Sequence, residues 1–454
     1  MAVWSEVLKS VVTHEHRLDA EFFDPKYLKI NDLLVNLSCK DMLGKLANNV
    51  KKGIFDISPS RYKSKGVPLI RTFQIKTPIA NEDNLVYIND IDHQNEFKKT
   101  ELLPGDIVFT KIGAGIGDVA VLPETFSKFN FSQNVAGVSV KSESISSYYL
   151  ISFLNSFYGR TQILRYMMPS GQGKLELRDI KKIIIPRFDA SLETEVSKLM
   201  KSSEEKALLS KSLYTQAQEL LEKELGLDML VFPATLYSES SFVSVINGHR
   251  LDAPHYQNKF NILIDHLHKF PIQTIRKIRT VNRRGLQPKY IENGDFSVVN
   301  SQHITSTHLA YDNFERTSEA EYLRAKAAHI LKDDVLIYTT GAYIGQTNLY
   351  DSEDPAMASN HVNVLRINCV DSAYLTMVLQ SIVGKYQTQM HARGSAQAEL
   401  YPSDIDKFFI PLLDDEKQLE IGNLLRQSLL AKRESENLLG EAKIMVEELI
   451  EGAI

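Results

Sequence analysis

Two basic runs at corresponding places in the chain contain the residue types that bind nucleic-acid phosphates. The first run, 45–65, has one acidic residue, Asp56, and six basic ones: Lys45, Lys51, Lys52, Arg61, Lys63 and Lys65. The second run, 276–289, has no acidic residue and six basic ones: Arg276, Lys277, Arg279, Arg283, Arg284 and Lys289. Cationic side chains that neutralise phosphates release condensed counterions, so a matched pair of runs favours DNA contact. A solvated surface without a ligand is the alternative.

Side chains that can recognise the edges of bases lie near both runs. Guanidinium groups and amides form paired hydrogen bonds with guanine and adenine in the major groove. The candidates in the first half are Arg71, Gln74, Gln133 and Asn134. The candidates in the second half are Asn300, Gln302, His303, Asn360 and His361. For each of them, an ordinary polar role in a loop or at a strand end is the alternative interpretation.

Two glycine-rich segments, GAGIG (113–117) and GAYIG (341–345), also occupy corresponding places. Neither has the GxGxxG spacing or the following helix that dinucleotide binding requires. Each fits a hairpin turn in which glycine supplies positive φ. The tip of such a turn, which includes Tyr343 in the second copy, is a candidate for ligand contact.

Catalytic signatures are missing from the sequence. It contains no GxxxxGK[ST], no HExxH, no nucleophile elbow and no (D/N)PP(Y/F) motif of amino-methyltransferases. Its two cysteines, Cys39 and Cys369, do not correspond between the halves, and its histidines share no ligand spacing. A duplicated enzyme would show its catalytic groups in both copies, so this pattern favours a binding protein with no cofactor of its own.

A tandem duplication must position these candidates. The segment SGQGKLELRDIKKIIIP (170–186) recurs as SAQAELYPSDIDKFFIP (395–411), at an offset of 225 residues and with eight of seventeen positions identical. The repeat places Gln172 and Gln397 alike, beside Arg165 and Arg393. Each amide could bind DNA or could fix its loop, and the sequence leaves both roles open.

A second repeated motif, HRLDA, begins at His16 and again at His249. An Arg-Asp pair ahead of an amphipathic helix favours a role in fixing the helix entry, with ligand binding as the alternative.

Each half reads as a mixed α+β body. Short apolar runs between Gly, Pro and Asn predict strands at 67–75, 84–88, 106–112, 118–122 and 135–140, and again at 296–304, 334–340 and 361–367. Apolar residues at three-to-four spacing predict one helix at 147–167 and its counterpart at 372–390.

Each half closes with a long helix whose apolar stripe has near-heptad spacing. Because such a stripe needs a partner, we expect the two helices to pack as an antiparallel coiled coil with the bodies at opposite ends. The expected domains are a first body (1–190), a central helix (191–228), a second body (229–413) and a distal helix (414–454).

The composition fits two ordinary domain cores, with 454 residues, 43% hydrophobic and 24% charged. The net charge is −5, but the two helical segments account for −3 and −5 and leave the remainder at +3. No signal peptide or membrane-spanning run is apparent, so we expect a protein of the reducing cytoplasm without membrane contact.

The order of motifs resembles that of the specificity (S) subunit of type I restriction-modification systems. The carriers are HRLDAEFFDPKY, VPLIRTFQI, LLPGDIVFTKIGAGIGDVAVL, FSQNVAGVSV and the SGQGKL loop with IIIP, each with a weaker echo in the second half. The resemblance implies two target recognition domains that each bind half of a split double-stranded DNA site. It also implies helices that dock methyltransferase (modification) subunits, with restriction or translocase subunits as further partners. S-adenosylmethionine, ATP and Mg²⁺ would then belong to those partner subunits.

Two other classes remain as alternatives. One is a catalytic nuclease or methyltransferase chain with an unrecognised site. The other is a scaffold of two adaptor domains on a coiled coil that does not contact DNA.

Overall fold

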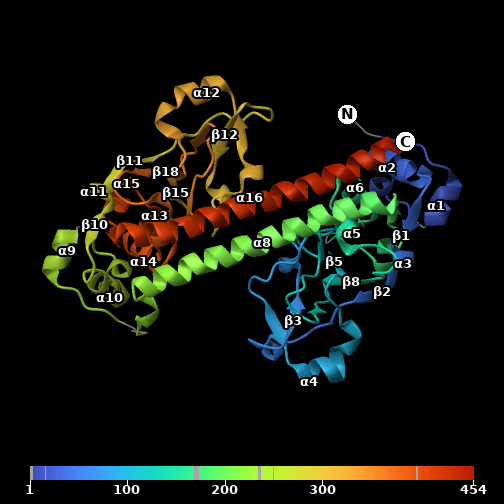
Figure 1. Cartoon of the computed structure of the whole chain (residues 1–454), viewed down its shortest axis with the longest axis horizontal. Coiled ribbons are helices and arrows are strands. Elements are labelled where there is room, and N and C mark those ends of the chain that lie inside the picture. Colours follow the sequence, from blue (N-terminus) through green and yellow to red (C-terminus); the bar gives the residue numbers. More distant parts are fainter. Residues whose placement is uncertain are drawn as a thin grey trace. The chain divides into compact units, whose positions relative to one another are not determined.

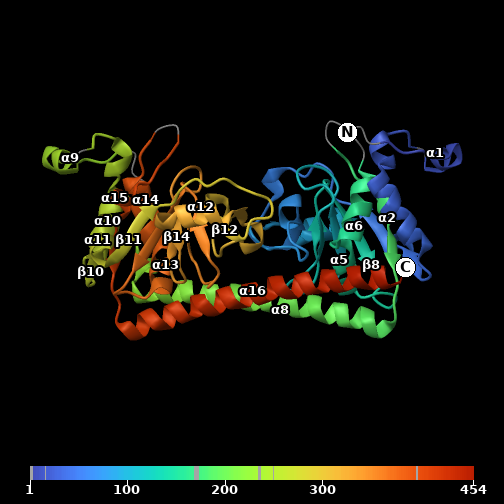
Figure 2. The same ribbon diagram turned by 90° about the horizontal axis from the view of Figure 1, so that it is seen from above.

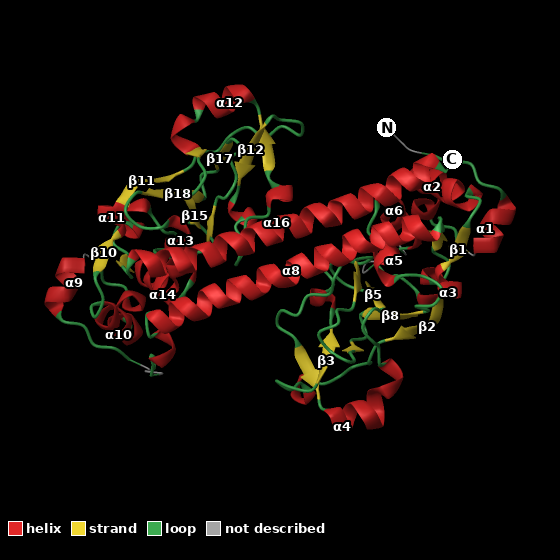
Figure 3. Cartoon of the chain, viewed as in Figure 1, coloured by secondary structure: helices red, strands yellow, loops and turns green. Residues whose placement is uncertain are grey.

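The computed structural model describes residues 4–15, 17–167, 173–233, 237–248, 250–394 and 397–453. It divides into two compact units. Unit 1 comprises Met1–Lys206 and Glu434–Ile454, and unit 2 comprises Ala207–Arg433. Each unit mixes helices and strands and contains one half of each long helix (Figure 3). The predicted tandem α+β fold is confirmed.

The centre of unit 1 is a four-stranded antiparallel sheet. Its order is β2 (Ala47–Lys52), β8 (Val135–Val140), β5 (Ile107–Thr110) and β6 (Val119–Val121). Both faces of β5 are covered, because Ile107 and Phe109 enter one hydrophobic cluster and Val108 enters another. Alternate side chains of a strand point to opposite faces, which explains why this strand is apolar throughout.

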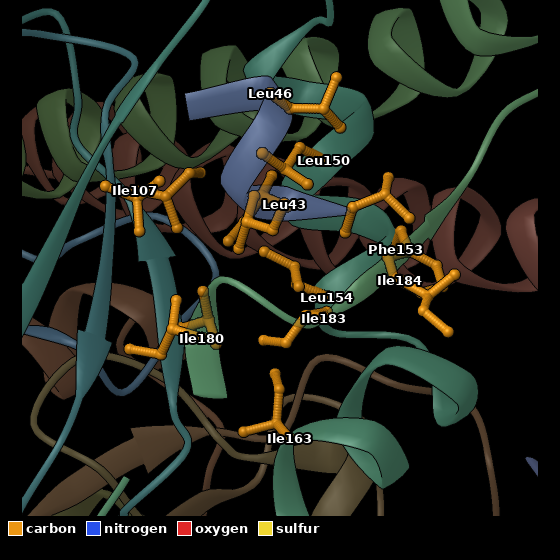
Figure 4. Close-up of a cluster of buried hydrophobic side chains, with 14 of the residues drawn as sticks. Leu43, Leu46, Ile107, Leu150, Phe153, Leu154, Ile163, Ile180, Ile183 and Ile184 are labelled. Carbon is orange, nitrogen blue, oxygen red and sulfur yellow. The ribbon is translucent and has the colours of Figure 1, made fainter. Parts of the chain in front are cut away.

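Two smaller sheets and several helices complete unit 1. The strands are β4 (Val86–Ile88), β3 (Val67–Ile70) and β7 (Asn130–Phe131) in one sheet, and β1 (Lys40–Met42) and β9 (Ile184–Pro186) in the other. The helices are α1 (Lys9–Glu15), α2 (Pro25–Asn36), α3 (Leu43–Leu46), α4 (Asp90–Asp92), α5 (Ser147–Leu154), α6 (Phe157–Tyr166) and α7 (Leu177–Ile180). Figure 4 shows how Leu43, Ile107, Leu154 and Ile180 gather from separate elements into the main core.

Unit 2 repeats this plan. Its central antiparallel sheet has the order β11 (Arg279–Arg284), β18 (Val362–Ile367), β15 (Val335–Tyr338) and β16 (Thr347–Leu349). The other strands are β13 (Glu315–Thr317), β12 (Phe296–Val299), β17 (Ala356–Ala358) and β14 (His329–Ile330), and the pair β10 (Ile272–Thr274) and β19 (Phe409–Pro411). The helices are α9 (Phe242–Gly248), α10 (Asn258–Leu267), α11 (Ile275–Ile278), α12 (Glu319–Arg324), α13 (Ser372–Gln380), α14 (Ile382–His391) and α15 (Pro402–Ile405).

The closing helices are α8 (Ala190–Glu224) and α16 (Asp415–Gly452), which lie side by side (Figures 1 and 2). In unit 1, Ser203 of α8 faces Ser435 of α16; in unit 2, Ser210 faces Ser428. The residue number rises along one helix as it falls along the other, so the helices are antiparallel. Apolar residues of both helices enter the main core of each unit.

One predicted helix in each half is divided in two. The segment 147–167 forms α5 and α6, because Ser156 accepts a hydrogen bond from Gly159 N (3.3 Å) and starts a new helix. The segment 372–390 divides in the same way at Ser381, which accepts from Val383 N (3.1 Å). A Cβ on Gly159 would lie 2.1 Å from Phe153 O, so this junction requires glycine.

The basic runs also form strands that the hydrophobic pattern did not predict. β2 contains Lys51 and Lys52, and β11 contains Arg279, Arg283 and Arg284. Each is the first strand of its four-stranded sheet and pairs on one side only within the described sheet order. A strand at a sheet edge tolerates charged residues. Among the described residues, every helix is too short or too polar to cross a bilayer.

Candidate nucleic-acid interface

One end of the four-stranded sheet in unit 1 gathers basic and amide side chains. β2 ends at Lys52, β5 ends at Thr110 just before Lys111, and β8 begins just after Gln133 and Asn134 (Figure 1). The pairs Lys52↔Ala136 and Thr110↔Val135 bring these strand ends together. A bridge between Ile112 and Lys174 adds the segment after α6. We call Lys52, Lys111, Gln133, Asn134 and Lys174 the first rim.

The equivalent end of the central sheet in unit 2 is the second rim, which consists of Arg284, Thr339, Asn360, His361 and Glu399. Arg284 pairs with the second residue of β18, as Lys52 does with that of β8. Thr339 N donates to His361 O (3.0 Å), and Lys111 N donates to Asn134 O (2.8 Å). The two rims therefore match position by position, as Lys52/Arg284, Lys111/Thr339, Gln133/Asn360, Asn134/His361 and Lys174/Glu399.

Lys111 is a rim residue that the sequence patterns missed. Its side chain is 8% exposed and makes no hydrogen bond or ion pair with the described residues. Burial lowers the pKa of the Lys111 ammonium, and the positive charges of Lys52 and Lys174 lower it further. Its signal in the sequence is a lysine placed directly after an apolar strand.

Arg284 is the central cation of the second rim. Its guanidinium lies 4.7 Å from the ring centroid of Tyr401 and donates to Leu400 O (3.1 Å). The Glu399 carboxylate is 3.9 Å away. The Tyr401 ring is also 5.8 Å from the guanidinium of Arg393, a predicted contact residue, which pairs with Asp404 (2.6 Å). Gln397, another predicted residue, follows Arg393 in the sequence and is exposed. Gln172 lies outside the described residues.

Several buried polar atoms at the rims lack a hydrogen-bond partner among the described residues. In and beside the second rim they are Arg284 Nε, Asn360 Oδ1 and Thr340 Oγ1. Beside the first rim, Thr110 Oγ1 has the same property. A buried unpaired polar group costs about 1–3 kcal/mol. A ligand that supplies the missing partners would remove this cost.

Other predicted side chains are engaged inside their own unit. Gln74 is 0% exposed, accepts from Arg71 N (3.1 Å) and donates to Asp83 O (2.8 Å). His303 is 1% exposed and accepts from Asn300 N (2.9 Å), and burial lowers its pKa. The arrangement favours a structural role for Gln74 and His303, which each close a short 3-10 turn.

The remaining predicted residues near these turns are more accessible. Arg71 donates to Asn84 O (2.8 Å), Asn300 accepts from the Tyr290 hydroxyl (2.9 Å), and Gln302 is exposed.

The basic runs divide into paired and exposed members. Arg61 pairs with Glu96 (2.7 Å) and Asp92 (3.1 Å), Arg279 pairs with Asp406, and Lys51 donates to Glu101 O (2.7 Å). The exposed members are Lys45, Lys52, Lys63, Lys65, Arg276, Lys277, Arg283 and Lys289, and Arg284 is half-buried. Exposed cations are the better candidates for phosphate contact, because a paired cation must first lose its partner.

The glycine segments form the turns between β5 and β6 and between β15 and β16, as predicted. Gly113, Gly115, Gly117, Gly341 and Gly345 all have positive φ. Both turns follow the strands that end at the rims. Tyr343 at the tip of the second turn is 64% exposed and borders a cavity of about 710 Å³ with Lys259 and Gln346.

The HRLDA arginines hold the chain ahead of the repeated loop. Arg17 pairs with Asp19 and donates to the carbonyls of Tyr166 (3.3 Å) and Met167 (3.2 Å). Arg250 pairs with Asp252 and donates to the carbonyls of Met390, His391 and Ala392 (2.9–3.3 Å). The last carbonyls of a helix have no partner within it. These contacts give the motif a structural role, but at the ends of α6 and α14 rather than at the entry of the following helix, where it was predicted.

Comparisons with known proteins identify a family and similar structures. A model described as the type I restriction modification DNA specificity domain matches residues 43–187 and 270–437, one range in each half and together more than half of the chain. A solved S subunit of a type I restriction-modification system from M. genitalium shares 13% identity, with 92% of this chain and 96% of that chain covered and a TM-score of 0.49. The HsdS subunit from Thermoanaerobacter tengcongensis shares 14% identity, with 91% and 97% covered and a TM-score of 0.30. No curated protein matches the chain.

Proposed function

The chain belongs to the type I restriction-modification DNA specificity family, and from this premise we propose that each unit binds one half of a split double-stranded DNA target. As a member of this family, the chain is a non-catalytic recognition subunit rather than an enzyme. S-adenosylmethionine, ATP and Mg²⁺ would be bound by partner subunits that methylate, translocate or cleave.

The observation that carries the proposal is the correspondence of the two rims. Each rim lies at the corresponding end of the central sheet of its own unit, next to the corresponding glycine turn. Equivalent places in duplicated units suit equivalent tasks, here contact with DNA. Their side chains differ at each of the five matched positions, so the two half-sites should differ in sequence.

The side chains of the two rims suit different kinds of contact with DNA. The first rim has three lysines, which suit phosphates and fix the position of a protein on DNA. The second rim has an arginine fork and an amide oxygen with unpaired buried atoms, which suit the donor and acceptor pattern of base edges. The exposed Gln302, Arg393 and Gln397 are further base-contact candidates.

The long helices are the proposed docking surface for methyltransferase subunits. In unit 2 they expose Leu208, Leu209, Leu419 and Leu430, each 46–54% accessible. Exposed leucines on a helix pair with its stripe already buried favour burial against another protein. Restriction or translocase subunits would join the same complex.

Selection of bound duplexes from a random library tests the proposal, using the purified chain alone and with its methyltransferase subunits. The expected result is a bipartite preferred sequence. The double variant Gln133→Ala/Asn134→Ala should relax one half-site, and the equivalent variant Asn360→Ala/His361→Ala should relax the other. A folded chain without sequence preference would contradict the proposal, and turnover by the stringently purified chain would support the catalytic alternative.

A further inference from the structure

Lys111 stands in an unusual position for a lysine. The residue as a whole is only 8% exposed, and its ammonium makes no hydrogen bond or ion pair with the described residues. The backbone around it is firmly held, because Lys111 N donates to Asn134 O (2.8 Å) and its carbonyl accepts from Leu175 N (3.0 Å). Partial loss of water without a protein partner is unfavourable for a cation, and groups perturbed in this way gather at functional sites.

Two more lysines surround this position. Lys52 and Lys174 lie close enough that their charges lower the pKa of Lys111 beyond the effect of burial. Glu176 is the one acidic group that opposes them, and it pairs with Lys174 (3.2 Å) and Arg178 (3.0 Å). The side chain of Lys52 is exposed. The lysine cluster, Lys52, Lys111 and Lys174, therefore combines a desolvated cation with two accessible ones.

The second unit has no such cluster at the equivalent positions. Thr339 takes the place of Lys111, and its hydroxyl donates to His361 O (2.9 Å). Glu399 takes the place of Lys174, and Arg284 takes that of Lys52. A sheet of this topology thus folds with a neutral, satisfied side chain at this place. A lysine at position 111 is therefore not a requirement of the fold.

We propose that the lysine cluster of unit 1 is a built binding site for a single phosphate group of the DNA backbone. A phosphate placed among the three ammonium groups would supply the missing partner of Lys111 and offset the repulsion between the lysines. This inference rests on the proposed function, since it assigns one contact within the DNA interface. It makes unit 1 the stronger source of salt dependence and leaves base recognition to other residues.

The test measures duplex binding by the full chain at several salt concentrations. Lys111→Met should lower the slope of log affinity against log salt by about one unit, and the surface variant Lys52→Ser/Lys174→Ser should lower it by about two. The control Lys99→Met, an exposed lysine in a short helix of unit 1, should keep the parental slope. The preferred sequence should not change in any of these variants.

The outcomes separate this inference from the proposed function. A parental chain that does not bind DNA overturns the proposed function, whereas a parental slope in the lysine variants overturns only the cluster. A changed preferred base would also overturn it, because phosphate contacts are independent of sequence. If Lys111→Met does not fold, the surface variant alone decides. As a second readout, inorganic phosphate should raise the melting temperature of the parent and the Lys99→Met control more than that of Lys52→Ser/Lys174→Ser, and an equal rise in all three would count against the site.

Discussion

Ser203 of α8 and Ser435 of α16 exchange hydrogen bonds between their backbones and side chains. Each hydroxyl donates to the carbonyl of the other residue at 2.7 Å, and both side chains are buried. In unit 2, Ser428 donates to Ser210 O at the same distance. Ser203 and Ser428 correspond at the repeat offset of 225, as do Ser210 and Ser435. The duplication thus preserved a polar contact between the two helices as well as their apolar stripe.

Removing this contact should loosen the helix pair of unit 1. The double variant Ser203→Ala/Ser435→Ala loses two buried hydrogen bonds, so we expect a loss of about 1–3 kcal/mol in the free energy of unfolding. Urea unfolding of unit 1, followed by hydrogen exchange in α8, measures it. Ser191→Ala on the exposed side of α8 should change stability by less than about 0.5 kcal/mol. Equal effects of both variants would show that the serine pair contributes nothing specific.

Two adjacent arginines of β11 should give different phenotypes. Arg283 is exposed, so Arg283→Gln should flatten the salt dependence of DNA binding by about one unit and keep the preferred sequence. Arg284 lies in the second rim with an unpaired Nε, so Arg284→Gln should alter the preferred base in one half-site. Library selection at two salt concentrations measures both effects, with Lys326→Gln as an exposed control. Unchanged selectivity in Arg284→Gln would assign this residue to packing against Tyr401.

Gln74 should affect stability rather than sequence preference. Gln74→Leu leaves Arg71 N and Asp83 O without their buried partner, at a cost of about 1–3 kcal/mol for each group that water cannot reach. Thermal unfolding and library selection together test this expectation. A variant with parental stability and a changed half-site would restore Gln74 as a base contact.

Unit 2 should be sensitive to acid through His391. Burial lowers the pKa of His391 from 6.5 to about 4, and the positive charges around it, including Lys407 and Arg250, act in the same direction, while Asp404 opposes them. Between these pH values the unfolded chain binds a proton that the folded chain does not, so stability falls as the pH drops from 6.5 to about 4. His391→Phe should lose less stability over this interval than the parent. The exposed His268→Phe should follow the parent, and the same acid response in both variants would exclude His391 as its source.

The repeat could be predicted from sequence identity between the halves. The apolar strands could be predicted because burial in a sheet requires hydrophobic residues along the strand. The run at 106–112 predicted β5, and the charged segment after Pro186 predicted α8. β2 and β11 were not predicted as strands, because edge strands need little apolar surface, and their charges were interpreted as a DNA contact or a solvated surface. The break between α5 and α6 at Ser156 was not predicted, because the helical spacing of apolar residues continues through it.

The candidate site was less readable, since burial decides the role of a polar side chain. Gln74 and His303 have suitable chemistry for base edges but are occupied within short turns. Lys111 belongs to no basic run, and only the pairing of β5 with β8 places it beside Lys52 and Asn134. Contact of the other predicted residues with DNA stays a prediction.

The charges on β2 and β11 also affect the tendency of the chain to aggregate before it is fully folded. An edge strand offers unpaired amide and carbonyl groups that another chain could extend into a larger sheet. Like-charge repulsion opposes such docking between copies. The charges are Lys51 and Lys52 at the edge of the sheet in unit 1, and Arg279, Arg283 and Arg284 at the edge of the sheet in unit 2. Variants that neutralise these residues should therefore precipitate more readily during refolding at low salt, separately from their effect on DNA binding.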